Sequence, residues 1–173
     1  INIVALVDDQ PKILNLKQVL EAFIRHRQEV VTRRTLFLMR KARDRAHSLE
    51  GFAVALANID EIIQIIKQSA TAADAREILV SKTWLPGDNV SKMLSKLEPG
   101  IARPEWLDEK YGFKNKKYKI SPEQAKDILE LRLNRLTGME HEKIIEEFHE
   151  KLEEIATYQN ILGNSDVLMD VIK

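Results

Sequence analysis

The 173-residue sequence contains no cysteine and has only six glycines and five prolines. The absence of cysteine excludes disulfides, thiolate catalysis, iron–sulfur clusters and cysteine-ligated zinc, and it favours a reducing compartment such as the cytoplasm. The glycines are never closer than twelve residues, so neither a dinucleotide-binding fingerprint nor a phosphate loop can be written. No apolar run approaches the roughly 18 residues of a membrane span. The sequence therefore predicts a soluble protein with no membrane partner.

The chain also lacks an excess of either charge, since 27 basic and 27 acidic side chains give a net charge of zero with neutral histidine. Any basic surface must therefore be local. A content of 44% hydrophobic and 31% charged residues is typical of a helix-rich folded protein rather than a disordered one. Because the first residue is Ile1 rather than methionine, we expect a piece of a longer protein.

Residues 1–14 predict a β-hairpin. Apolar residues from Ile3 to Val7 precede the turn-forming Asp8-Asp9-Gln10-Pro11, and a second short apolar segment follows. Because two isolated strands are only marginally stable, we expect this hairpin to be the edge of a larger sheet.

Residues 15–57 predict one long helix, with Asn15 as its N-cap and no proline in its interior. A helix of this length spans roughly 60 Å, far more than an ordinary globular helix. Its apolar stripe, which includes Leu20, Phe23 and Val30, is close to a heptad repeat but is interrupted by arginines. We therefore predict that the stripe is the seam of a two-helix coiled coil.

The partner of that seam is predicted in residues 139–173. There Phe148, Leu152 and Ile155 have the alternating spacing of a coiled coil. The stretch from Arg25 to Arg45 has a net charge of +6, whereas residues 140–173 have a net charge of −6. Because the chain must reverse between the two stretches, we predict a mainly α fold with a long antiparallel two-helix coiled coil.

Residues 58–138 predict a small helical domain at the far end of the coiled coil. Helices are expected over 59–67, 71–80 and 89–97, and residues 82–120 form a loop-rich stretch whose two tryptophans, Trp84 and Trp106, are packing anchors. Ser121-Pro122-Glu123-Gln124 is a capping-box start for a further helix to Thr137. The expected bending points are Asn58, Gly138 and Gly163.

The sequence gives little support for a catalytic or a metal-binding function. Glu146 and His149 match half of a di-iron carboxylate motif, and Asp44 with His47 resembles a second half, but helical geometry turns Glu146 away from the seam and towards water. The three tyrosines, Tyr111, Tyr118 and Tyr158, have no neighbouring base that would activate them. We therefore predict no catalytic residue, no metal and no cofactor in this chain. The arginines between Arg25 and Arg45 keep one alternative interpretation open, in which this helix contacts DNA phosphates.

The helix expected over 122–137 is apolar on two sides. Ile128 belongs to an ordinary core stripe, whereas Leu131 is turned away from that stripe and Leu133 lies on its opposite flank. Two interpretations remain open. Either the small domain wraps around the helix, or Leu131, with Ile128 and Arg135, meets another subunit.

Four runs resemble the A subunits of the type IIA DNA topoisomerases, the family of DNA gyrase and topoisomerase IV, and the resemblance covers essentially the whole chain. The runs are residues 4–8 with 10–12, residues 25–35, residues 40–47 and residues 131–140. The run at residues 55–60 and the tryptophan-containing loops favour the gyrase branch over topoisomerase IV.

This resemblance implies that residues 1–14 end the tower domain, 15–57 and 139–173 form a coiled-coil arm, and 58–138 form the exit gate for the transported DNA duplex. It implies a homodimer through that gate, and a complete, ATP-dependent bacterial enzyme in the cytoplasm that acts on double-stranded DNA together with the B subunit of gyrase. The catalytic tyrosine and the DNA-wrapping domain of the family lie outside this chain. The dimer contacts are then expected at Ile128, Leu131, Leu133, Arg135 and Met139.

Overall fold

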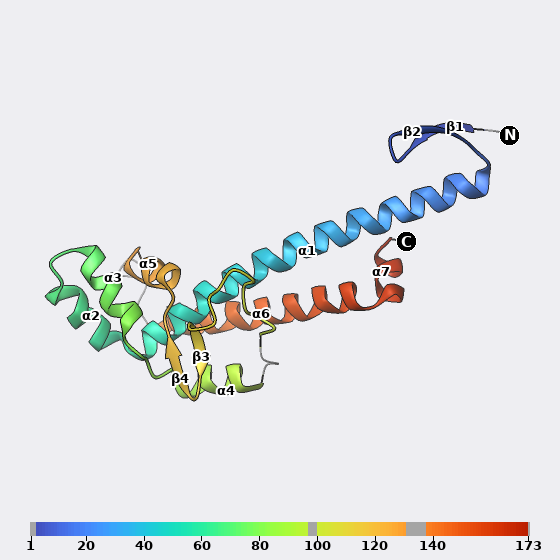
Figure 1. Ribbon diagram of the computed structural model, residues 1–173. Helices are drawn as coiled ribbons and strands as arrows, with labels where there is room; N and C mark the ends of the chain where they lie inside the picture. The colour runs from blue at the N-terminus through green and yellow to red at the C-terminus, as the bar shows by residue number, and fades with distance from the viewer. Residues whose placement is uncertain (1–2, 97–99, 131–137, 173) are drawn as a thin grey trace. The chain divides into compact units, whose positions relative to one another are not determined.

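A computed structural model describes residues 3–96, 100–130 and 138–172 (Figure 1). The chain forms two compact units. Unit 1 contains Ile1–Met39 and Thr157–Lys173, and unit 2 contains Arg40–Ala156. These units do not coincide with the four predicted segments, because each unit takes a part of both long helices. The predicted mainly α fold is confirmed, and none of the helices in the described parts is long and apolar enough to cross a membrane.

Helix α1 covers Leu16–Ala57 without a break, as predicted, and the return helix α6 covers Gly138–Gly163. Asn15 caps α1 as expected: its side-chain Oδ1 accepts from the Gln18 N–H at 2.9 Å, and Gln18 Oε1 accepts from the Asn15 N–H at 2.9 Å. This reciprocal pair satisfies two of the backbone donors that a helix start leaves open. A last helix, α7, covers Ser165–Ile172.

The predicted N-terminal hairpin is also confirmed. Strand β1, Ile3–Val7, pairs antiparallel with β2, Gln10–Leu14. The turn residues Asp8 and Asp9 have φ values of 54° and 60°. Two successive left-handed residues make the turn whose twist matches that of antiparallel strands.

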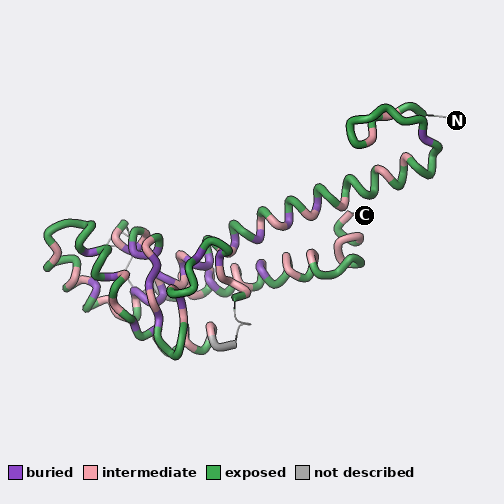
Figure 2. The backbone as a smooth tube through the Cα atoms, in the orientation of Figure 1, coloured by how far each residue is buried: buried purple, intermediate pink, exposed green. Residues whose placement is uncertain are grey.

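Four shorter helices surround the core of unit 2, which includes the end of α1 (Figure 2). They are α2 (Ile59–Gln68), α3 (Ala72–Ser81), α4 (Asp88–Lys96) and α5 (Pro122–Glu130). Each agrees with a predicted helix to within a residue or two where it is described. The fully buried large side chains of unit 2 are Leu49, Val54, Ile62, Leu79, Trp84, Tyr118, Ile120, Gln124, Phe148 and Ile155.

Asn58 lies at the junction of α1 and α2. Asn58 gives α2 no side-chain cap. Its Nδ2 instead donates to the carbonyl oxygens of Val54 and Leu85, both at 2.8 Å. Asn58 therefore joins the last turn of α1 to a distant loop, and bending at this proposed hinge would break both hydrogen bonds.

The stretch predicted as loop-rich contains a second hairpin that the sequence analysis missed. Strand β3, Gly112–Lys114, pairs with β4, Lys117–Lys119, and Tyr118 also bridges to Trp84. The Trp84 and Tyr118 backbones exchange two hydrogen bonds of 2.8 Å. Three-residue strands are too short for alternating hydrophobicity to show, so only their tertiary setting reveals them.

Candidate functional site

The residues predicted at the coiled-coil seam differ in burial between the two units. In unit 2, Phe148 and Ile155 of α6 are 1% and 0% exposed and Leu152 is half-buried. The buried residues of α1 in this unit are spaced as a coiled coil requires. They include Ala42, Ala46, Leu49 and Ala53.

In unit 1 the seam prediction for α1 is wrong. Leu20, Phe23 and Val30 are 53%, 59% and 38% exposed. The buried positions are instead Val31, Thr35 and Met39. Helix α1 carries two apolar stripes, and the prediction selected the one with the larger side chains. Where α7 approaches α1, the Gln28 amide donates to the Met169 sulfur at 3.1 Å, on the side of the buried stripe.

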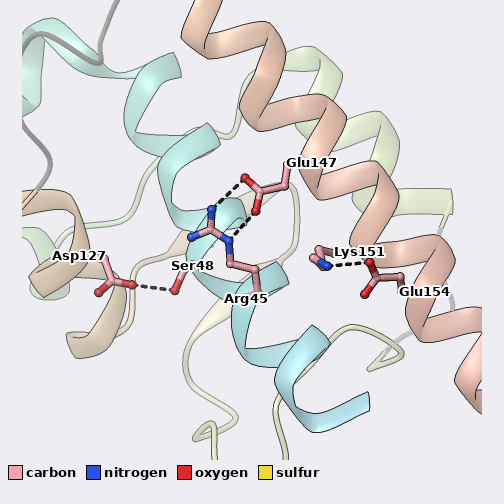
Figure 3. A network of polar contacts seen from close by, with 6 residues as sticks. All are labelled: Arg45, Ser48, Asp127, Glu147, Lys151 and Glu154. Carbon is pink, nitrogen blue, oxygen red and sulfur yellow. Dashed lines mark hydrogen bonds and ion pairs between the residues drawn. The ribbon is translucent and has the colours of Figure 1, made fainter. Parts of the chain in front are cut away.

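A bidentate ion pair links the end of α1 to the start of α6 in unit 2 (Figure 3). Arg45 Nε and Nη2 donate to the two carboxylate oxygens of Glu147 at 2.6 and 2.8 Å. The hydrogen bond to Glu147 raises the pKa of the Arg45 guanidinium above its ordinary value. Because both side chains are more than a third exposed, the pair fixes orientation and contributes only about 1 kcal/mol or less.

Other basic residues of α1 find partners away from α6, contrary to the expected pairing of two oppositely charged helices. Arg40 and Arg43 reach Glu105 of the loop region at 3.5 and 3.7 Å. Arg33 pairs with Glu29 of the same helix. The two stretches carry opposite net charges. Among the ion pairs described here, however, it is mainly Arg45 that joins one stretch to the other.

A buried polar junction connects α1 to α5. The Gln124 side-chain amide donates to the His47 carbonyl and to the Tyr118 hydroxyl, both at 2.7 Å. His47 Nε2 lies 2.9 Å from Ser121 Oγ, and Gln124 Nε2 lies 3.3 Å from His47 Nδ1. Both ring nitrogens of His47 thus lie within hydrogen-bonding distance of side chains of α5 and its cap.

The predicted capping box at the start of α5 is confirmed, and it is part of this junction. The Gln124 N–H donates to Ser121 Oγ at 3.2 Å, and the Ser121 N–H donates to Gln124 Oε1 at 3.0 Å. Gly51 of α1 makes room for it, because a Cβ there would lie 2.8 Å from Gln124 Cγ. One turn further along α5, Asp127 accepts from Ser48 Oγ at 2.6 Å (Figure 3). The stretch of α1 from His47 to Gly51 thus fixes the orientation of α5.

Burial shifts the pKa values of the ionisable side chains in this junction. It lowers the pKa of His47 to about 4, so the ring is neutral at pH 7. It raises the pKa of the partly buried Glu50 to about 7, although a hydrogen bond from Tyr118 opposes the shift. Burial and the neighbouring Glu50 carboxylate also raise the pKa of Tyr118. These groups lie in one hydrogen-bonded junction, which suits a structural joint rather than a reaction centre.

The sequence-based candidates for metal binding and catalysis are dispersed. His149 is exposed and lies 3.4 Å from Glu153, whereas Asp44 accepts a hydrogen bond from the indole of Trp106 at 2.8 Å. Within the described residues no group of three or more histidines and acids is placed to hold a metal ion. Trp84 is buried and donates to the Leu79 carbonyl at 3.0 Å, as a packing anchor does. Trp106 is half-exposed, with its ring edge against His47.

The residues expected at a dimer contact lie mostly outside the described part of the chain. This holds for Leu131, Leu133 and Arg135, and for the side chain of Met139. Ile128 is described and is 7% exposed in the core of its own unit. Its predicted contact with a second subunit therefore stays a prediction, as do the bending points at Gly138 and Gly163.

The sequence analysis did not identify the junction built on His47, Glu50 and Tyr118. The capping box and Gly51 are visible signals, but only the fold brings them together. In the sequence, His47 stands out solely as half of a metal motif with Asp44. A single histidine one turn from a helical glycine carries no local signature of burial.

The family model for the A subunit of DNA gyrase/topoisomerase IV matches residues 1–173. The DNA gyrase A subunits of Aeromonas salmonicida and Pseudomonas aeruginosa are each 54% identical over the whole chain, and that of Haemophilus influenzae is 46% identical over the whole chain. The chain spans 19% of the length of each of these three relatives. The chain therefore belongs to the family of DNA gyrase and topoisomerase IV A subunits.

Proposed function

We propose that this chain is the coiled-coil arm and exit gate of a gyrase-type A subunit. In this role it joins two subunits through residues 58–138 and opens to release the transported DNA duplex during supercoiling. Such a module works mechanically and needs no catalytic residue, metal or cofactor of its own. ATP-dependent topoisomerase activity, association with the gyrase B protein and action on double-stranded DNA in the bacterial cytoplasm are proposed for the complete enzyme.

The observation that best supports this proposal is the rigid attachment of α5 to α1. A gate that opens by movement of its arms must transmit force from the arm helix to the contact surface. Three side-chain links do so: Gln124 to the His47 carbonyl, His47 to Ser121, and Ser48 to Asp127. The predicted contact residues from Leu131 onward follow directly after α5 in the chain.

Sedimentation equilibrium over a wide concentration range tests the dimerisation role. We expect the chain to dimerise and Leu131→Asp to weaken the dimer at least about tenfold, because a carboxylate would be buried in an apolar contact. Leu85→Asp is the matched control, since Leu85 is 67% exposed in the same unit and was not predicted at the contact. A chain that stays monomeric at high concentration, or a Leu131→Asp variant that dimerises normally, would contradict the proposal.

The corresponding part of a topoisomerase IV A subunit is the alternative within the same family. The complete protein, combined with ATP and its partner B protein, distinguishes the two. Introduction of supercoils into relaxed plasmid supports the gyrase assignment. Relaxation of supercoiled plasmid without that activity supports topoisomerase IV.

A DNA-contacting arm is a second candidate, favoured by the cluster of arginines on α1. Arg27 and Arg34 are exposed, and neither forms an ion pair with a described residue. If this surface holds phosphates, DNA binding falls steeply with salt and weakens when Arg33 and Arg34 are neutralised. Absence of binding at low salt would exclude this function.

A further inference from the structure

The outer face of α1 in unit 1 carries an apolar stripe with the spacing of a helix-pairing surface. Leu16, Phe23 and Val30 recur every seven positions, and Leu20 follows one turn after Leu16. Leu16, Leu20, Phe23 and Val30 are 66%, 53%, 59% and 38% exposed, respectively. A heptad stripe of this kind drifts by only about 20° per repeat, so it forms one continuous ridge along the helix.

This ridge is distinct from the surface that α1 already buries. At 100° per residue, Thr35 of the buried stripe lies about 140° around the helix from Val30. Val31, Thr35 and Met39 are 9%, 6% and 6% exposed, so α1 buries that face between residues 31 and 39. Figure 2 shows buried and exposed positions alternating along this part of α1. The helix therefore presents two pairing surfaces, of which one is covered.

Arginines define the chemistry of the uncovered ridge. Arg27 and Arg34 lie within about 60° of Val30 on one side, at the positions where a coiled coil has its second core residue. Arg33 lies on the other side, about 60° away. Neither Arg27 nor Arg34 has an ion-pair partner among the described residues. A covering helix must then supply acids, because an arginine buried without a partner is strongly destabilising.

We infer that this ridge docks an acidic amphipathic helix from the part of the full-length protein that lies beyond these 173 residues. Its apolar face covers Phe23 and Val30, and two acids seven residues apart meet Arg27 and Arg34, which are about 10.5 Å apart along the axis. The relatives are about five times as long as this chain, which spans 19% of them. A helix tethered within the same polypeptide binds at a high effective concentration.

Other occupants fit the ridge less well. In an antiparallel pair with a second copy, Arg27 would face Arg34, and in a parallel pair each arginine would face itself, so like charges would meet in the seam. Double-stranded DNA would satisfy the arginines but would leave the apolar ridge uncovered. This inference rests on family membership and not on the exit gate, because it involves different residues from the Leu131 test.

Site-specific photocrosslinking in the full-length protein tests it. The photoreactive residue p-benzoylphenylalanine replaces Phe23 in one variant. It replaces Lys17 in the control, since the Lys17 side chain is 82% exposed and lies about 140° from Val30. We expect the Phe23 probe to crosslink within its own polypeptide to an acidic helical peptide outside residues 1–173, with at least about ten times the yield of the control. A crosslink to a second copy, to added DNA or to residues 1–173, or equal yields, would overturn the inference.

Alkylation of a cysteine at Val30 tests the role of charge. In the full-length protein, Val30→Cys should react at least about tenfold more slowly than Lys17→Cys, and Arg27→Glu with Arg34→Glu should abolish that protection. Lys17→Glu with Lys12→Glu, the same charge change away from the ridge, should leave it intact. Absence of protection, or protection that survives the arginine changes, would contradict the inference. The Phe23 probe alters no charge and decides the matter if the arginine variant does not fold.

Discussion

The two units of this chain differ in the side chains that they bury and in those that they leave exposed to solvent. Unit 2 buries His47, Ser121 and Gln124 and satisfies each of them with hydrogen bonds. Unit 1 leaves large apolar side chains in solvent, both on its hairpin, where Leu6 is 74% exposed, and along α1. A buried polar group is tolerated only with its partners present, and an exposed apolar ridge usually indicates a missing partner. Unit 2 thus satisfies its buried polar groups internally, whereas unit 1 exposes an apolar ridge, which is the face that the inferred helix would cover.

The largest expected effect is the difference in stability between a substitution in the core of unit 2 and one on its surface. Leu49 is 1% exposed on α1, and Leu49→Ala should lower the free energy of unfolding by about 2–5 kcal/mol through lost burial and a residual cavity. Leu85→Ala, at a site 67% exposed, should cost less than about 0.5 kcal/mol. Urea unfolding followed by tryptophan fluorescence measures both, because both tryptophans lie in unit 2. Equal costs would show that unit 2 is not packed as described.

A second test uses the opposed titrations of Glu50 and His47. The folded-state pKa of Glu50 is about 7, above the ordinary 4.5, so its contribution is lost as the pH rises through that range. The folded-state pKa of His47 is about 4, below the ordinary 6.5, so stability is lost as the pH falls through that range. Each effect amounts to roughly 3 kcal/mol, and the two oppose each other between pH 4.5 and 6.5.

Single variants should separate these two slopes. Glu50→Gln should make the stability rise with pH from 4.5 to 6.5, whereas His47→Gln should make it fall from 4.5 to 7. Urea unfolding at intervals of half a pH unit measures both slopes. Parallel pH profiles for the two variants and the unchanged chain would mean that these groups are not buried as a junction.

The smallest expected effect compares the turns of the two hairpins. Asp9 in unit 1 and Lys116 in unit 2 have φ values of 60° and 62°, where a side chain is strained. Lys116→Gly should stabilise unit 2 by about 1 kcal/mol, whereas Asp9→Gly should gain roughly 0.5 kcal/mol, because aspartate tolerates this conformation better. Tryptophan fluorescence reports the first change, and amide hydrogen exchange of β1 and β2 reports the second. A loss of stability in either variant would contradict the turn geometry.

Local signals predicted the helices and the first hairpin well. Asn15 before an uninterrupted run of helix formers gave the start of α1, and Ser121 with Gln124 gave the start of α5. The second hairpin was missed because three-residue strands carry no readable period. The junction was missed because His47, Glu50 and Tyr118 come from elements far apart in the sequence.

Heptad spacing predicted that α1 pairs with another helix but did not identify the face of α1 that is buried. Leu20, Phe23 and Val30 fit the predicted seam in spacing and size, yet in unit 1 the buried stripe runs through Val31 and Thr35. A helix propensity, a cap or a turn depends on residues a few positions apart, so the sequence by itself determined those elements. The choice between two apolar faces depends on the position of the neighbouring helix, and the pKa values of His47 and Glu50 depend on what excludes water from them. Those outcomes were decided only by the tertiary structure, because burial is a property of the assembled chain.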